Sequence, residues 1–170
     1  AIPEMGRTTA SSLAKFHDNL QAVAESPLLH EVIALDEKVA ETVRINPRSR
    51  KNRPNSDADK AGREQLYTSL VSEIRELLGR LELLGLAKIT KENGAPPPNY
   101  TTEVGPSVAR SVLDWFASGI GHATLERLAK LGIYPRGDRP GGGVFNGKTF
   151  VITGTLPTMS RDEAKAKIEA

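Results

Sequence analysis

One segment of the sequence occurs twice, and this repeat restricts the possible fold more than any other feature. Residues 2–13 align with residues 101–112, which places Gly6 opposite Gly105. In both copies a Glu precedes an apolar residue and the Gly, an Ala follows four places after the Gly, and an aliphatic residue follows three places later. The spacing predicts a tight turn, in which the Gly takes a positive φ or lies close to another backbone, and then a helix with the Ala and the aliphatic residue inside.

Such a turn would direct backbone N–H groups outward, where the oxygens of a phosphate can accept their hydrogen bonds. Contacts of this kind hold the backbone of a nucleic acid without reading its bases. The pattern is typical of a helix-hairpin-helix arm, and its duplication predicts two such arms. The alternative is that both glycines only permit tight turns between packed helices.

Composition excludes several classes of function. With 170 residues, 38% of them hydrophobic and 5% aromatic, we expect two weak cores joined by linkers. The net charge of +2 gives no strong basic field, so any contact with nucleic acid must come from local clusters. The absence of cysteine excludes disulfides, thiol nucleophiles and Cys-ligated zinc, and it fits a reducing compartment. No apolar run has membrane-spanning length and no signal peptide is evident.

The apolar spacing predicts a mainly α-helical chain. We expect helices over residues 7–16 and 19–24, and a third that begins at Pro27 after the N-cap Ser26 and ends near Pro47. Residues 46–59 lack periodicity and contain a basic cluster, so they predict an exposed, mobile loop in which the solvated interpretation is favoured over phosphate binding. The members of the cluster are Arg48, Arg50, Lys51 and Arg53.

A long amphipathic helix is expected from Lys60 to Leu84, with an apolar stripe that predicts a core seam. The stripe consists of Leu66, Leu70, Ile74, Leu77, Leu81 and Leu84. A short strand over 87–90 and a proline-containing linker over 91–100 should follow. The second repeat then opens a helix through Phe116, and a further helix over 123–131 ends at Gly132.

The residue pattern changes from helical to strand-like after residues 134–143. These residues include two prolines and four glycines and predict a domain boundary. Residues 148–153 predict a strand, residues 154–157 a turn, and Ser160 with Glu163 a capping box that opens the last helix.

The stretch from Phe145 to Ile168 resembles the opening of a BRCT domain, and in particular the one that ends NAD-dependent DNA ligases of bacteria. In that family it follows a helix-hairpin-helix domain, whose last arm resembles residues 103–116 and whose helix end resembles residues 125–133.

This resemblance, which covers residues 1–26 and 101–170, implies a division into domains. Residues 1–133 would form a helix-hairpin-helix DNA-binding domain, with 27–100 as an atypical insertion; 134–144 would be a linker, and 145–170 the first strand and helix of a truncated α/β BRCT domain. The chain begins at Ala1 inside a repeat and stops at Ala170 in a helix, so we expect a piece of a larger protein. The catalytic lysine domain, the oligonucleotide-binding fold and the zinc finger of the family would lie before it. No catalytic residue and no bound cofactor are expected here, whereas NAD, Mg and Zn are expected for the full-length enzyme.

The candidate DNA-binding residues lie in three places. They are the start of the first repeat, the start of the second repeat, and the strand end and helix start of the BRCT-like segment, where the resemblance implies contact with phosphate. For this third place, capping and turn hydrogen bonds are an equally weighted alternative. The candidates are Gly6, Arg7, Thr8, Thr9, Gly105, Ser107, Val108, Arg110, Thr153, Gly154 and Arg161.

The expected function is therefore to grip nicked double-stranded DNA as part of an NAD-dependent DNA ligase of replication and repair. We expect a cytoplasmic, nucleoid-associated monomer without membrane contact. The three histidines show no metal-ligand spacing, and no nucleophile–base pair or Walker loop is present. Two alternatives stay open: a non-enzymatic helix-hairpin-helix repair scaffold, and a BRCT-based protein-interaction module.

Overall fold

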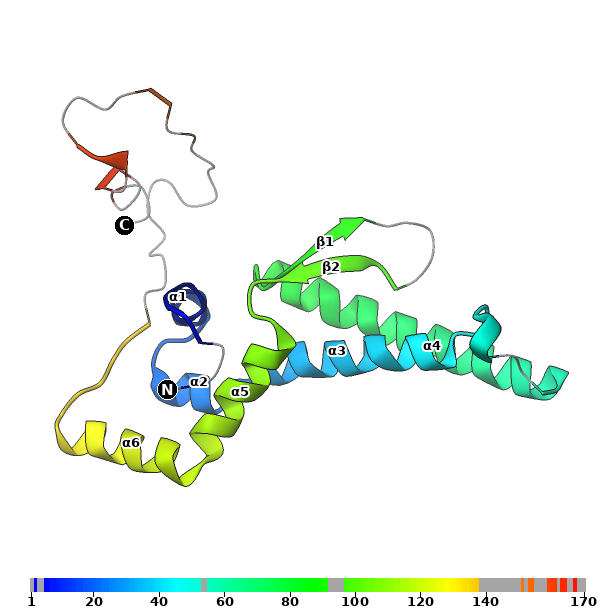
Figure 1. Cartoon of the computed structure of the whole chain (residues 1–170), viewed down its shortest axis with the longest axis horizontal. Helices are drawn as coiled ribbons and strands as arrows, with labels where there is room; N and C mark the ends of the chain where they lie inside the picture. Colours follow the sequence, from blue (N-terminus) through cyan, green and yellow to red (C-terminus); the bar gives the residue numbers. More distant parts are fainter. Residues whose placement is uncertain are drawn as a thin grey trace.

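The chain is mainly α-helical, with one small antiparallel sheet, as the sequence predicted (Figure 1). The computed structural model describes residue 2 and residues 5–52, 55–91 and 97–137. In the last part of the chain it describes residues 151, 153, 154, 159–161, 163, 164 and 167.

The first three helices match the sequence prediction closely. Helix α1 spans Arg7–Phe16, α2 spans Leu20–Ala24 and α3 spans Pro27–Ile45. The predicted cap of α3 is present, because the Ser26 side chain accepts a hydrogen bond from the Leu29 N–H at 3.2 Å and Pro27 occupies the first turn. These boundaries were predictable because each is set by a local signal in the sequence.

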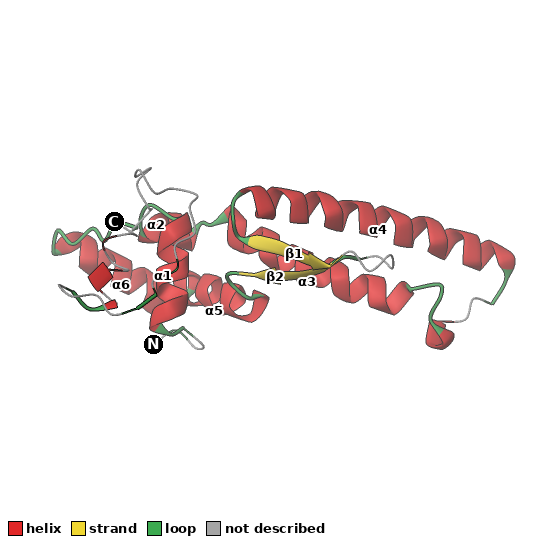
Figure 2. Cartoon of the chain, turned by 90° about the horizontal axis from the view of Figure 1, so that it is seen from above, coloured by secondary structure: helices red, strands yellow, loops and turns green. Residues whose placement is uncertain are grey.

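Helices α3 and α4 lie side by side as a long antiparallel pair (Figure 2). Helix α4 spans Asp57–Leu83, so it begins three residues earlier than predicted. Its N-cap is Ser56, which accepts from the Asp59 N–H, and its first turn contains two Asp residues that favour the positive end of the helix dipole. The two helices are joined across their surfaces by ion pairs between Lys38 and Glu73 and between Arg80 and Glu31.

The predicted apolar stripe of α4 is a core seam in its middle part only. Leu70, Ile74, Leu77 and Leu81 are buried, whereas Leu66 is 48% exposed and Leu84 is 51% exposed. Buried positions that the stripe missed are Tyr67, Val71 and Leu78. The buried positions of α4 therefore run from Tyr67 to Leu81, so the core covers the C-terminal part of this helix.

A single core connects the helix pair to the repeat helices. Leu13 of α1, Leu29 and Val32 of α3, Ile74 of α4 and Val112 of α5 belong to one buried cluster. Helix α5 spans Pro106–Ala117 and packs on α2, α3 and α6. The segment 27–100 therefore shares its core with the second repeat.

The two strands form a β-hairpin over the helix pair (Figure 1). Strand β1 covers Ala87–Lys91, and it pairs antiparallel with β2, Asn99–Thr102, with a register shift between Ile89 and Lys91. The β2 strand lies partly in the region predicted as a linker. Three of its four residues are Tyr or Thr, which are enriched in strands, and pairing with β1 fixes the extended backbone.

Helix α6 spans Gly119–Lys130 and begins four residues before the predicted start at Ala123. The Ser118 hydroxyl accepts from the Gly121 N–H at 3.1 Å and caps the helix. Gly121 lies against α5, because a β-carbon added there would be 2.1 Å from the Trp115 carbonyl oxygen. The predicted end is confirmed: Gly132 follows the helix with a φ of 68°.

After α6, the chain returns to the first repeat. The Gly137 N–H donates to the Asp18 carbonyl at 2.7 Å, and Arg136 forms a β-bridge with Asn19. A β-carbon on Gly137 would be 1.7 Å from the His17 carbonyl oxygen. A pocket of about 700 Å³ lies beside this contact, between α2, α6 and residues 133–137.

The junction of α1 and α3 is held by a buried histidine. The Nδ1 atom of His17 lies 2.9 Å from the Leu13 carbonyl oxygen, and its Nε2 lies 2.6 Å from the Ser26 hydroxyl. A carbonyl can only accept, so we assign the proton to Nδ1, and Nε2 then accepts from Ser26. His17 thus has a structural role, and no described group of three or more His, Asp or Glu residues could hold a metal ion.

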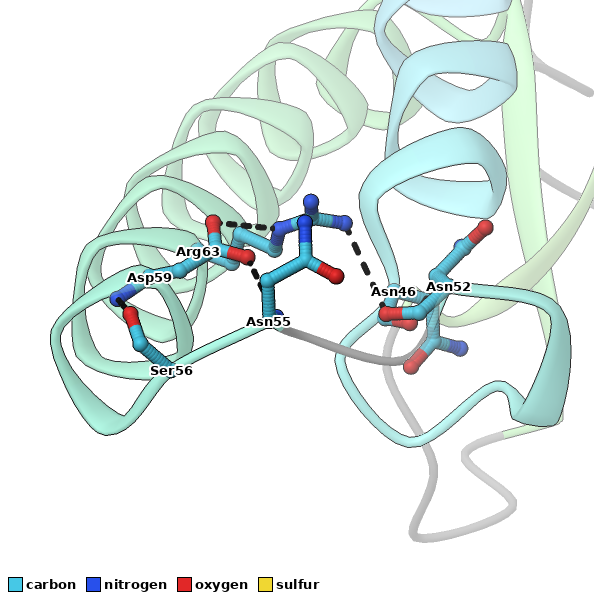
Figure 3. A network of polar contacts seen from close by, with 6 residues as sticks. All are labelled: Asn46, Asn52, Asn55, Ser56, Asp59 and Arg63. Carbon is cyan, nitrogen blue, oxygen red and sulfur yellow. Dashed lines mark hydrogen bonds and ion pairs between the residues drawn. The ribbon is translucent and has the colours of Figure 1, made fainter.

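The described residues of the connection between α3 and α4 form hydrogen bonds (Figure 3), and part of the loop predicted over 46–59 is helical, because α4 begins at Asp57. A 3₁₀ helix covers Arg50–Asn52, and the Asn52 side chain donates to the Val43 and Asn46 carbonyls at the end of α3, both at 3.3 Å. On the other side, the Arg63 guanidinium donates to Asp59 at 2.9 Å. Side-chain amides and an ion pair therefore fix the turn where apolar periodicity is absent.

Asp59 is the centre of the α4 end of this network. It accepts from Arg63 and from the Asn55 N–H at 3.0 Å, and these hydrogen bonds lower the pKa of its carboxyl group. A lowered pKa means that the contribution of Asp59 to stability is present above its ordinary pKa, near 3.8, and is lost as the pH falls through the lowered value.

We expect the Asn55 amide signal in an NMR titration to stay constant from pH 7 to about pH 5 and to move only below the ordinary Asp pKa. The Asp59→Asn variant provides the control, because it removes this titration while it keeps an acceptor. A midpoint at or above the ordinary value for Asp would contradict the assigned role of Asp59.

The described residues of the last segment confirm one prediction there. Ser160 and Glu163 form the capping box: the Glu163 N–H donates to the Ser160 hydroxyl at 3.2 Å, and the Ser160 N–H donates to the Glu163 carboxylate at 2.7 Å. The second of these bonds lowers the pKa of Glu163. Most of the strand predicted over 148–153 lies outside the described residues, and Val151 and Thr153, which are described, have no strand assignment.

Candidate nucleic-acid interface

The starts of α1 and α5 differ from those of the other α-helices between residues 5 and 137. Helices α2, α3, α4 and α6 each begin with a side chain that caps a first-turn N–H, from Asn19, Ser26, Ser56 and Ser118. Helices α1 and α5 begin at Gly6 and Gly105, and neither start has a side-chain cap. These are the two helix starts that the sequence repeat predicted as phosphate sites.

The conformation of the two glycines corrects part of the prediction. Gly6 has φ −91° and ψ 176°, and Gly105 has φ −71° and ψ 156°, so both are extended and neither has a positive φ. A β-carbon added at either position would have no described atom within 4 Å. Neither the backbone conformation nor packing within the described chain requires glycine there, and the space outside both helix starts is open.

The inner faces of the two helices agree only in part. At the aliphatic position, Leu13 and Val112 are both buried, as predicted. At the alanine position, Ala109 is fully buried, but Ala10 is exposed, which corrects its predicted place on an inner face. Helix α5 is enclosed by α2, α3 and α6, whereas α1 is covered on the side of Leu13.

The candidate residues at the two helix starts are accessible to different degrees. Gly6, Arg7 and Thr8 are exposed and Thr9 is partly exposed. In the second repeat, Ser107 is exposed, and Gly105 and Val108 are partly exposed. Pro106 occupies the first turn of α5 and has no N–H, so the donors at this start are the amides of Ser107 and Val108 within the helix and that of Gly105 before it.

Arg110 has protein partners in the structure. Its guanidinium donates to the Asp36 carboxylate at 3.3 Å and to the Glu37 carboxylate at 3.3 Å, and so joins α5 to α3. A phosphate at this position would have to compete with two carboxylates. The sequence could not indicate these partners, because they are more than seventy residues away in the chain.

One hydrogen bond brings the three candidates of the last segment together. Gly154 has a φ of 79°, and its carbonyl accepts from the Arg161 guanidinium at 3.2 Å. Thr153, Gly154 and Arg161 are all exposed. Arg161 therefore contacts the residue that follows Thr153, and it keeps donors on its solvent side.

Comparison with known proteins shows that the chain is similar to part of the DNA ligases. It is 34% identical to a DNA ligase of Akkermansia muciniphila over 163 residues, which cover 91% of this chain and 20% of that protein. It is also 46% identical over 70 residues to a DNA ligase of Desulforudis audaxviator and 43% identical over 67 residues to DNA ligase 1 of Opitutus terrae; each match covers 39% of this chain and 10% of the relative. No family model and no solved structure matches the chain.

The helical architecture with two uncapped helix starts is thus found in a chain whose relatives are named DNA ligases. More specifically, the chain is homologous to a segment of the DNA ligases and spans about a fifth of the length of the A. muciniphila relative. Among the described residues, no helix is long and apolar enough to cross a membrane.

Proposed function

We propose that this chain grips the sugar-phosphate backbone of nicked duplex DNA through the starts of α1 and α5, as a helix-hairpin-helix segment of an NAD-dependent DNA ligase. The observation that carries the proposal is the pair of uncapped helix starts in a DNA ligase relative. First-turn N–H groups without a capping side chain, at the positive end of a helix dipole, bind anions favourably.

The contacts would come from the amides of Gly6, Arg7 and Thr8 and from those of Gly105, Ser107 and Val108. The hydroxyls of Thr8, Thr9 and Ser107 and the Arg7 guanidinium would add donors to phosphate oxygens. Because these contacts do not involve base edges, binding should be independent of sequence. Thr153, Gly154 and Arg161 form the proposed accessory phosphate contact of a BRCT-like segment.

The whole enzyme would join a 5′-phosphate to a neighbouring hydroxyl in nicked DNA, in replication and repair. NAD would supply the adenylate, with Mg and Zn as the metals, and all three would be bound outside this chain. We propose no catalytic residue within it. We also propose that the protein is a monomer, and that it lies in the cytoplasm in association with the nucleoid.

The test is equilibrium binding of the full chain to two nicked 30-base-pair duplexes of unrelated sequence. We expect dissociation constants in the range of about 10⁻⁶ to 10⁻⁴ M at physiological salt, equal within about threefold for the two sequences. Affinity should fall with increasing salt, because cations released from the DNA are the main driving force. A chain that shows no binding at low salt, or that strongly prefers one sequence, would contradict the proposed grip.

A further inference from the structure

A local excess of positive charge lies at one end of the α3–α4 pair. We call residues 44–63 the tip; they run from the last turn of α3 to the second turn of α4. The tip contains seven Lys or Arg residues and two Asp residues, a net charge of +5, whereas the whole chain carries +2. The remaining residues together therefore carry −3, and the tip is a local positive field on an otherwise slightly acidic molecule.

Four cationic side chains of the tip are exposed and make no ion pair with a described residue. They are those of Arg44, Arg48, Lys51 and Lys60. Arg63 is the exception, because its guanidinium is engaged by Asp59. Elsewhere, Lys38, Arg80 and Arg110 are paired with carboxylates.

A hydrogen-bond network holds the described residues of the tip on both sides. Asn46 and Asn52 tie the connection to the end of α3, and Ser56, Asp59 and Arg63 tie it to the start of α4 (Figure 3). The Arg63 guanidinium also approaches the Asn52 carbonyl, at 3.5 Å, and so bridges the two sides. A segment that is already ordered by hydrogen bonds loses less conformational entropy on binding than a flexible linker with the same charges.

The tip projects beyond the proposed DNA grip on a rigid support (Figures 1 and 2). Arg110, one turn into α5, is anchored at Asp36 on α3, and α3 continues to Ile45. At about 1.5 Å per residue, the tip begins about 12 Å further along the axis of α3. A duplex that rests on the start of α5 is therefore long enough to reach the tip within one helical turn, about 34 Å.

We propose that the tip is a second, separate contact with the phosphate backbone of the same duplex, away from the two helix starts. This inference rests on the proposed function, since it takes DNA as the ligand of the chain. The tip would bind phosphates through the charges of Arg48, Lys51 and their basic neighbours, without reading bases. It lengthens the footprint of the chain on DNA and raises the affinity in low salt.

The chemistry of the tip favours a nucleic-acid backbone over other polyanions. A lipid surface would be expected to meet apolar or aromatic anchors as well as cations, and the residues of the tip include none that is aromatic. An acidic protein partner would require shape-complementary apolar contacts, and the tip offers Ile45 as its one large aliphatic residue. A cluster of cations without apolar anchors suits the regularly spaced phosphate charges of DNA.

The test compares variants of the full chain on a nicked 30-base-pair duplex over a range of salt concentrations. The tip variant is Arg48→Ser/Lys51→Ser; in the native chain both residues make their local hydrogen bonds through backbone N–H groups, which the substitution keeps. We expect about a tenfold loss of affinity at 0.1 M salt and a decrease of about 2 in the slope of log K against log salt. The matched control, Arg75→Ser/Lys88→Ser, removes two exposed cations elsewhere and should bind like the parent.

The outcomes separate this inference from the proposed function. If the parent binds DNA and the tip variant binds equally well with an unchanged slope, the tip contact is wrong and the grip stands. If the control loses as much affinity as the tip variant, the effect is one of net charge and the tip contact is also wrong. If the parent itself does not bind DNA, the proposed function fails.

A mapping experiment locates the contact directly. The sequence contains no cysteine, so Ala58→Cys places a single thiol on the exposed first turn of α4 in the tip, and Ser72→Cys places one in the middle of the same helix. With a DNA-cleaving iron chelate attached, we expect the Ala58 site to cut the backbone strongly and the Ser72 site more weakly. Equal or absent cleavage from the Ala58 site would overturn the tip contact, as would binding of a poly-glutamate peptide with the affinity of DNA.

Discussion

Replacing both Gly6 and Gly105 with Val should lower the affinity for nicked duplex DNA by about 100-fold while the fold is retained. Both positions have extended backbone that Val adopts readily, and an added side chain meets no described atom. The stability loss should stay within about 1 kcal/mol, because Val is only a poorer N-cap than Gly. The side chains would occupy the open space in front of both helix starts, where the phosphates are proposed to lie.

The magnitude follows from the hydrogen bonds that would be blocked. A charge-assisted hydrogen bond contributes about 1.5 to 3 kcal/mol, and each 1.4 kcal/mol is a factor of ten in affinity, so one lost bond per helix start gives roughly 100-fold. Fluorescence anisotropy of labelled DNA measures the affinity, and thermal unfolding by circular dichroism verifies the fold. Gly79→Val is the control, since it also adds a side chain into open space but lies within α4.

If the double variant binds DNA like the parent, the two helix starts do not hold phosphate. If only one of the single variants, Gly6→Val or Gly105→Val, weakens binding, then only one copy of the repeat binds phosphate. The second copy is the one expected to dominate in that case, because α5 is fixed on three sides by other helices.

Replacing Gly121 with Ala should lower the free energy of unfolding by about 3 kcal/mol, at the upper end for overpacking. The added β-carbon would lie 2.1 Å from the Trp115 carbonyl oxygen and 2.8 Å from the Phe116 α-carbon. Both are backbone atoms, so no side chain can rotate away, and α5 and α6 must separate. The same shift would disturb the cap that Ser118 provides to the Gly121 N–H.

Chemical denaturation followed by tryptophan fluorescence measures this effect, because Trp115 is the single tryptophan and lies at the α5–α6 contact. The control is Gly119→Ala, two residues earlier, where an added β-carbon has open space. We expect it to be neutral or slightly stabilising, since Ala is the better helix former. Equal stabilities for the two variants would show that the α5–α6 contact is looser than the structure indicates.

The glycines illustrate how much of the structure the sequence could predict. The repeat identified Gly6 and Gly105 and placed both at helix starts, which is confirmed, but the proposed backbone reason was wrong. The glycines that close approach does require are Gly121 and Gly137, and neither was singled out. Close approach depends on which backbone lies opposite, and a local sequence pattern has no information on that.

The same distinction holds for the other elements. The caps at Ser26 and Ser160 and the end of α6 at Gly132 follow from neighbouring residues, and all three were predicted. The Arg110 ion pairs depend on partners distant in the sequence, and they were not predicted. The β2 strand was not predicted either, although its partner β1 is its neighbour in a hairpin. The start of α4 is a different case, because Ser56 and two early Asp residues were a readable cap that the lack of apolar periodicity obscured.

The shared core also limits how the protein could be shortened. Trimming the α3–α4 arm down to a plain loop would leave Ala109 and Val112 facing water, since Val32 and Leu35 of α3 belong to the same buried cluster. A compact version of this molecule would therefore need a redesigned face on α5 as well as a deletion. The α3–α4 pair therefore supports α5, whose start is the second of the two proposed phosphate sites.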